Sequence, residues 1–168
     1  NAQGIVGQYF YDGDGKRVKK VVPGTGETTI FVYDATGKLV AEYSTIVEPA
    51  STAQISYLTN DHLGTPRITT DAIGQTISRR DFMPFGEEIT RPTYGTDSLR
   101  QKFTSYERDS ESGLDFAQAR YYGGNYGRFT SPDNFLNSTR PENPATWNLY
   151  AYVLNNPLRY VDPSGEIE

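Results

Sequence analysis

The chain has 168 residues, a net charge of −5 and no cysteine. The length fits one domain, or one domain with part of a repeat array. The negative charge argues against nucleic acid as the main partner, because phosphate binding needs a basic surface, and the lack of cysteine excludes disulfides and thiolate metal sites. Aromatic residues make up 13% of the chain, beside 16 Gly and 10 Pro, which is typical of short strands joined by many turns. The composition therefore predicts a mainly β protein.

Repeated segments in the first half predict β-hairpins. Residues 11–18 (YDGDGKRV) are echoed by residues 33–40 (YDATGKLV) and more weakly by residues 70–77 (TDAIGQTI). In each copy the Asp can accept hydrogen bonds from its own turn, and the Gly can take a positive φ. Such hairpins bury their apolar faces by stacking on neighbouring copies. The basic run at residues 16–20 (KRVKK) is expected to be a solvated strand edge.

The rest of the chain predicts a loop, short strands and one helix. Residues 147–155 are the best helix candidate, with Thr146 as its N-cap and the Asn-Asn-Pro at 155–157 as its end. Residues 97–103 fit a strand or a short helix. A loop is expected at residues 44–54, and strands are expected at residues 55–58, 79–82 and 114–122.

Few residues in the sequence favour catalysis or metal binding. His62 is the single histidine and is expected to bond its own loop. Asp12 and Asp14 could open a calcium loop, but Lys16 stands where an oxygen ligand belongs. No phosphate-cradling glycine loop is present. We therefore expect no metal and no cofactor. The sequence also shows neither an apolar run long enough to span a membrane nor a signal peptide.

Six motifs follow one another along the second part of the chain. They are residues 61–67 (DHLGTPR), 84–87 (PFGE), 119–122 (ARYY), 127–133 (GRFTSPD), 148–157 (NLYAYVLNNP) and 162–165 (DPSG). This ordered set resembles the Rhs repeat-associated core domain, which closes Rhs and YD-repeat proteins, including polymorphic toxins and the C components of Tc toxins. The hairpins before it resemble YD repeats.

The resemblance implies a fold and a division of the chain. Residues 1–56 would form antiparallel YD-repeat hairpins in a spiralling sheet. Residues 57–168 would form the Rhs core segment that closes this sheet and contains one short helix. The expected partners are the remainder of a longer YD-repeat shell or a C-terminal effector. The resemblance also places the parent protein outside the cell or on its surface.

The resemblance further implies a candidate catalytic pair. Many members of this family cut themselves after an Asp-Pro-x-Gly-Leu motif, and two aspartates are implicated, whose matches here are Asp133 and Asp162. Two close carboxylates can share a proton, so that one activates water while the other polarises the scissile carbonyl. Arg128 is expected to position Asp133 through a charge-assisted bond. The chain would then be an aspartic peptidase that acts once on itself.

The cleavage motif departs from the family pattern at two positions. It comprises Pro163, Ser164, Gly165 and Glu166, in which Glu166 stands where the family has Leu. Asn134 likewise stands where the family has Pro after the first aspartate. Both aspartates also fit a purely structural role as turn residues.

Three functions therefore remain open from the sequence. The chain could be a structural plug of a secreted or surface YD-repeat protein, or a self-cleaving domain that releases a downstream segment. It could also be a stand-alone adhesion or self-assembling β module, because exposed strand edges can pair with a second copy and form a homo-oligomer.

Overall fold

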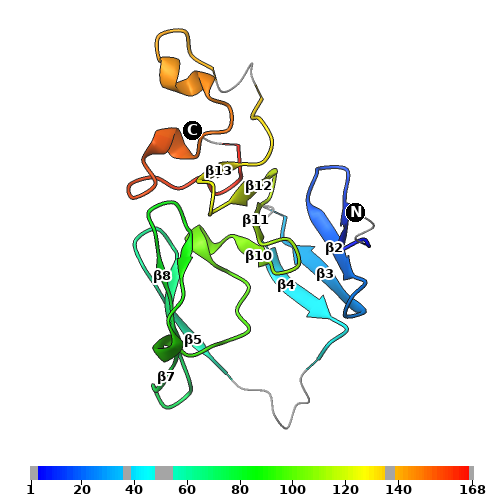
Figure 1. Ribbon diagram of the computed structural model, residues 1–168. Helices are drawn as coiled ribbons and strands as arrows, with labels where there is room; N and C mark the ends of the chain where they lie inside the picture. The colour runs from blue at the N-terminus through cyan, green and yellow to red at the C-terminus, as the bar shows by residue number, and fades with distance from the viewer. Residues whose placement is uncertain (1–3, 36–38, 48–54, 135–138, 167–168) are drawn as a thin grey trace. The chain divides into compact units, whose positions relative to one another are not determined.

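The computed structural model describes residues 4–35, 39–47, 55–134 and 139–166 (Figure 1). Its strands are short and antiparallel, and every helical segment among these residues is a 3-10 turn. The mainly β fold expected from the composition is confirmed. The chain forms two compact units, residues 1–53 and 54–168, and each is described by itself.

The N-terminal unit is one four-stranded sheet with strands in sequence order. In the first turn, Asp12 Oδ1 accepts hydrogen bonds from the backbone N–H of Asp14 at 3.0 Å and of Lys16 at 2.9 Å, and Gly15 has φ 79°. This is the turn that the first repeat predicted. The turn of the second repeat falls largely outside the described residues. The strands are β1 (Gln8–Tyr11), β2 (Arg17–Val22), β3 (Glu27–Tyr33) and β4 (Leu39–Ser44).

The basic run is not a solvated edge, and that expectation is wrong. Strand β2 lies between β1 and β3, and Arg17 and Lys20 are 0% and 2% exposed. The Arg17 guanidinium lies 5.5 Å from the ring centre of Tyr9 and 4.8 Å from that of Phe31. Aromatic faces attract a cation and cover its apolar stem. A central strand can therefore carry these side chains.

The other face of this sheet presents apolar side chains to solvent. Strand pairing sets Phe10, Ile30 and Tyr43 in one row with Lys19. These three side chains are 46%, 42% and 65% exposed. Among the described residues of this unit, Phe31 is the one buried apolar side chain. The sheet therefore contains little apolar core of its own.

The described residues of the C-terminal unit form small antiparallel sheets and short 3-10 segments. Strands β5, β6 and β7 form one sheet, β8 pairs with β9, and β10 to β13 form a third sheet in sequence order. The strands are β5 (Tyr57–Asn60), β6 (Pro66–Thr70), β7 (Thr76–Arg79), β8 (Asp81–Phe82), β9 (Glu88–Ile89), β10 (Glu107–Asp109), β11 (Leu114–Ala117), β12 (Arg120–Gly123) and β13 (Arg128–Phe129). The 3-10 segments are η1 (Pro92–Tyr94), η2 (Phe103–Ser105), η3 (Pro144–Trp147) and η4 (Val153–Asn155).

Three of the elements expected in this unit differ from the structure. Residues 114–122 form a hairpin rather than one strand, because Gln118 takes a positive φ of 63° and turns the chain. Residues 147–155 form no continuous helix, because η3 ends at Trp147, and η4 contains Leu154 at φ 51°. The cap of η3 is Asn143 rather than Thr146, since the Asn143 side chain accepts a hydrogen bond from the N–H of Ala145. Residues 97–103 were expected to form a strand or a short helix, but residues 97–102 form neither, and Phe103 begins η2.

Aromatic rings fill the core of the C-terminal unit. Tyr122 is 0% exposed, and its ring centre lies 4.9 Å from that of Tyr152 and 5.5 Å from that of Phe129. Burial raises the pKa of the hydroxyl groups of Tyr106 and Tyr122. The Tyr122 hydroxyl donates to the Phe85 carbonyl oxygen at 2.7 Å, so the ring is buried without losing its polar partner. The buried members of the core are Phe103, Tyr106, Ala117, Tyr122, Phe129, Tyr152 and Val153.

Candidate functional site

The candidate site includes the turn at residues 162–166, which are the last described residues. Asp162 Oδ1 accepts from the N–H groups of Ser164, Gly165 and Glu166 at 3.2, 2.8 and 3.2 Å, and Gly165 has φ 76°. The same Asp-x-x-Gly turn forms at residues 12–16, 61–65 and 71–75. The expected cleavage motif is therefore built on the turn that the YD repeats use.

The turn at residues 162–166 is bonded to the core of the C-terminal unit. The N–H of Ala119 donates to the carbonyl oxygen of Ser164 at 3.0 Å. The buried hydroxyl of Tyr106 donates to the carbonyl oxygen of Asp162. Both partners are far away in sequence, so these bonds fix the turn against β11, β12 and η2.

Gly165 allows the close approach of this turn to the β11–β12 hairpin. A Cβ at this position would overlap the carbonyl oxygen of Ala117, and the positive φ is unfavourable for other residues. The Nε of Arg120 donates to the Gly165 carbonyl oxygen. The backbone conformation of Gly165 and the buried side chain of Arg120 therefore fix the position of the turn together.

Arg120 joins the two candidate aspartates. Its Nη2 lies 2.8 Å from Asp133 Oδ2 and 3.6 Å from Asp162 Oδ2, and the three side chains are 6%, 8% and 0% exposed. The guanidinium lies 3.7 Å from the Phe129 ring centre, and its Nη1 donates to the Leu149 carbonyl oxygen at 3.1 Å. A buried charge is tolerated when it is paired and hydrogen-bonded in this way.

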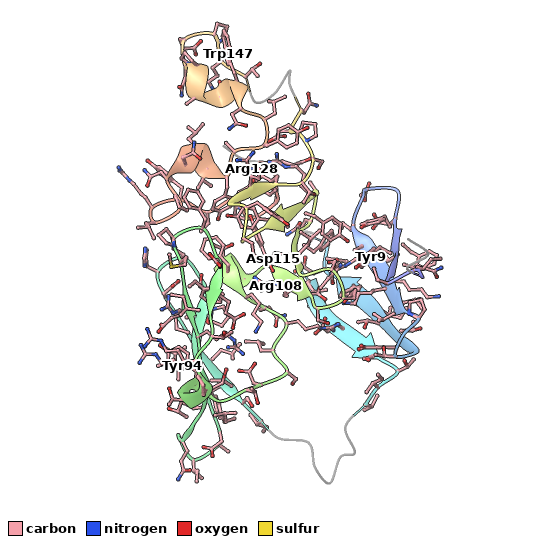
Figure 2. The ribbon with its side chains drawn as sticks, viewed as in Figure 1. Tyr9, Tyr94, Arg108, Asp115, Arg128 and Trp147 are labelled. Carbon is pink, nitrogen blue, oxygen red and sulfur yellow. The ribbon has the colours of Figure 1, made fainter. Side chains whose placement is uncertain are left out.

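The position of Arg128 differs from the sequence expectation. Arg128 belongs to β13 and is exposed (Figure 2), whereas Arg120 forms the ion pair with Asp133. The expected positioning partner was therefore the wrong arginine. Arg120 lies in the ARYY motif, but sequence reasoning read that segment as part of one strand and missed the buried site. The sequence feature that could have indicated a buried arginine is its position between Ala119 and Tyr121, one small and one aromatic residue.

The cleavage motif is partly exposed to solvent. Gly165 is buried, Ser164 is half-buried, and Pro163 and Glu166 are exposed. An exposed Glu166 requires no apolar pocket for its side chain. Residue 167, which follows it, lies outside the described residues.

The remaining candidate residues lie elsewhere. His62 is exposed, and its Nε2 lies 3.1 Å from the carbonyl oxygen of Leu158, so the expectation that it bonds its own loop was wrong. Asp61 instead makes that turn. In the described part of the chain, no group of three His, Cys, Asp or Glu side chains could hold a metal ion. The same residues include no helix long and apolar enough to cross a membrane.

The chain is similar in sequence to several known proteins. The family model described as Teneurin YD-shell matches residues 1–158. The tRNA3(Ser)-specific nuclease WapA of Bacillus spizizenii is 30% identical over 164 residues, which cover 96% of this chain and 7% of that protein. The toxin protein Tse5 of Pseudomonas aeruginosa is 34% identical over 115 residues, covering 68% of this chain and 8% of that protein. The salivary gland surface protein 1 of Aedes aegypti is 30% identical over 110 residues, covering 64% of this chain and 3% of that protein.

Solved structures show the same fold. The crystal structure of TcdB2-TccC3-Cdc42 has a TM-score of 0.71 at 22% identity and covers 95% of this chain and 9% of that chain. The Photorhabdus luminescens Tc holotoxin pore has a TM-score of 0.67 at 23% identity, with the same coverage. The chain thus spans less than a tenth of the length of each protein it matches. By its sequence and its fold, it belongs to the Teneurin YD-shell family of Rhs/YD-repeat proteins.

Proposed function

We propose that this chain is the closing domain of a longer YD-repeat shell and holds the segment 162–166 against its own core. The observation that carries this proposal is the burial of Asp162 and Gly165 together with the bonds that their segment makes to the core. Asp162 is 0% exposed. Its side chain lies within ion-pair distance of Arg120, and its carbonyl oxygen accepts a hydrogen bond from Tyr106. The carbonyl oxygens of Ser164 and Gly165 accept hydrogen bonds from Ala119 and Arg120. A loop at the protein surface would leave such polar groups to water.

The proposed partners follow from the lengths of the relatives. Because the chain matches less than a tenth of each of them, the remainder of the shell is the first partner. A C-terminal effector is the second, which is supported by relatives named as a nuclease and a toxin. A secreted or surface location is also part of the proposal, supported by the mosquito relative named as a surface protein.

Amide hydrogen exchange on the full chain tests the anchoring role. Replacing Arg120 with Gln removes the buried cation that contacts Asp133 and Asp162, so the amides of residues 164–166 should lose much of their protection. The exposed Arg128→Gln variant is the matched control and should keep it. Equal protection of this segment in both variants would sink the proposal.

Self-cleavage is the second candidate function, favoured by one specific observation. The two aspartates that the resemblance singled out both contact Arg120 Nη2, and the Gly165 carbonyl is bonded to the same side chain. In this proposal the carboxylate of Asp133 takes a proton from a water molecule, whose oxygen attacks the carbonyl carbon of Glu166. The peptide bond to residue 167 then breaks, and Asp133 returns the proton to the leaving amine. The Oδ1 of Asp162 already accepts three backbone N–H bonds, which favours a positioning role for Asp162.

Intact mass of the chain with a C-terminal extension tests this second function. The expected result is loss of everything after Glu166 in the parent and an uncut Asp133→Asn variant. The Asp12→Asn variant makes the same substitution at a turn residue of the N-terminal unit, outside the proposed site, so it should be cut like the parent. A parent that keeps its full mass removes self-cleavage and leaves the closing role.

A further inference from the structure

A cavity of about 390 Å³ lies beside η1 in the C-terminal unit. Its volume falls within the range of about 300–1,000 Å³ that is usual for small-molecule sites. Tyr94, at the end of η1, stands at its wall and is labelled in Figure 2. The site at Arg120 shares no lining residue with this cavity, so the two are distinct.

The wall of the cavity is cationic although the chain as a whole is acidic. Four basic side chains and two acidic ones line it, in a protein of net charge −5. An excess of one sign of charge in a concave surface attracts ligands of the opposite sign. The basic residues are Arg79, Arg80, Arg91 and Lys102, and the acidic residues are Glu88 and Asp97.

The inner charges are largely paired with each other. Arg80 bonds the carboxylate of Asp97, and that carboxylate also accepts a hydrogen bond from Thr69 at 2.9 Å. The Nζ of Lys102 lies 3.7 Å from Glu88 Oε1. Burial lowers the pKa of Lys102, so an anion in the cavity would favour its charged form.

Two guanidinium groups lie over Tyr94. Arg79 and Arg91 lie 5.4 Å and 5.8 Å from the centre of its ring. Arg79 also reaches Asp81 Oδ2 at 3.4 Å. Within the described ranges, no carboxylate is paired with the exposed Arg91. Stacking on an aromatic ring orders a guanidinium but leaves its N–H donors for a ligand.

The wall that carries these groups is held in place before any ligand arrives. A Cβ at Gly95 would overlap the carbonyl oxygen of Ile77, so the loop lies directly against β7. The N–H of Tyr94 donates to the Arg91 carbonyl oxygen at 3.0 Å, and the N–H of Leu99 donates to Asp97 Oδ1 at 3.0 Å. Preorganisation of this kind lowers the entropy cost of binding.

We propose that this cavity binds a small hydroxylated ligand with one oxyanion group, a carboxylate or a phosphate. Arg91 and Arg79 bind the oxyanion, because a guanidinium offers paired donors to such a group. The hydroxyl groups of Thr90 and Thr96, which also line the cavity, face the hydroxyls of the ligand. The acidic sugars glucuronate and glucose 6-phosphate have this chemistry.

Calorimetric titration of the full chain tests the proposal. Glucuronate and glucose 6-phosphate serve as probes, and their ratio tells whether carboxylate or phosphate is preferred. At least one of them should bind, more weakly at high salt, while glucose should not bind. Arg91→Gln should weaken binding about tenfold or more, the loss expected when a charged hydrogen bond is removed.

The control variant is Arg159→Gln. Arg159 is also exposed and lies over a tyrosine, 5.3 Å from the ring centre of Tyr160, but it is not part of the cavity wall. It should bind the probes like the parent. Three results would overturn the proposal: neither acid binds, glucose or inorganic phosphate binds as tightly as the acidic sugars, or Arg91→Gln binds like the parent. Arg91 forms no ion pair with a carboxylate of the described residues, so its replacement should leave the fold intact, and a thermal melt verifies this.

Discussion

The two units of this chain use the same turn but fill their interiors differently. In the N-terminal sheet the buried side chains are mainly polar or charged, such as Arg17, Lys20 and Thr29. In the C-terminal unit a cluster of aromatic rings surrounds Tyr122. An Asp-x-x-Gly turn therefore shapes a hairpin locally but does not make a domain. A domain also needs an apolar core formed by its own side chains. The N-terminal hairpins lack such a core, as expected of units that stack on neighbours.

The largest expected effect comes from separating the units. Residues 54–168 alone should unfold cooperatively and keep the near-ultraviolet circular dichroism of packed tyrosines. Residues 1–53 alone should show neither property, because their described part buries one apolar side chain, Phe31. A cooperative melt of the isolated N-terminal unit would contradict the comparison.

Truncating the aromatic core should have the next largest effect. Tyr122→Ala removes a fully buried ring that contacts four other rings, so the free energy of unfolding should fall by about 3–5 kcal/mol. Tyr43→Ala, at a 65% exposed position of the N-terminal sheet, should change it by less than about 0.5 kcal/mol. Urea denaturation measures both, and similar losses in the two variants would count against a core confined to the C-terminal unit.

A pair of glycine variants compares one turn in two settings. Gly15 and Gly165 have φ 79° and 76°, so alanine should cost each about 1–2 kcal/mol of backbone strain. At Gly165 the new Cβ would also overlap Ala117, whereas at Gly15 nothing lies within 4 Å. Gly165→Ala should therefore lower the free energy of unfolding more than Gly15→Ala. Equal losses would show that the turn at residues 162–166 is not tightly packed.

The smallest expected effect concerns alkaline pH. Burial raises the pKa of Tyr106, Tyr122 and Tyr152, so the folded state holds these protons above about pH 10 while the unfolded state releases them. Their contribution to stability is complete below about pH 10 and is lost as pH rises further.

Tyr122→Phe tests this pH dependence. It should lose about 1 kcal/mol at neutral pH with the Phe85 hydrogen bond, but its stability should decline less steeply above about pH 10 than that of the parent. Denaturation at a series of pH values provides the slope. An unchanged slope in Tyr122→Phe would mean that its hydroxyl ionises freely in the fold.

The accuracy of the sequence predictions depended on how local each feature is. The turns at Asp12 and Asp71 were predictable because one carboxylate and one glycine within five residues define them. The helix expected at residues 147–155 was wrong, since positive φ values at Val153, Leu154 and Asn155 let this segment enter the aromatic core instead. No pattern in the neighbouring sequence predicts these backbone angles.

The sequence by itself determined the family, the β character and the turns, because these depend on residue types at short spacings. The tertiary structure alone decided which arginine joins Asp133 to Asp162, and that Arg17 and Lys20 are buried. It also decided that Arg79 and Arg91 meet over Tyr94. Each of these depends on contacts between segments that are separate in the chain, such as Arg17 with Phe31 or Arg79 with Tyr94. Their geometry is set by how strands and turns pack and not by the spacing of the residues.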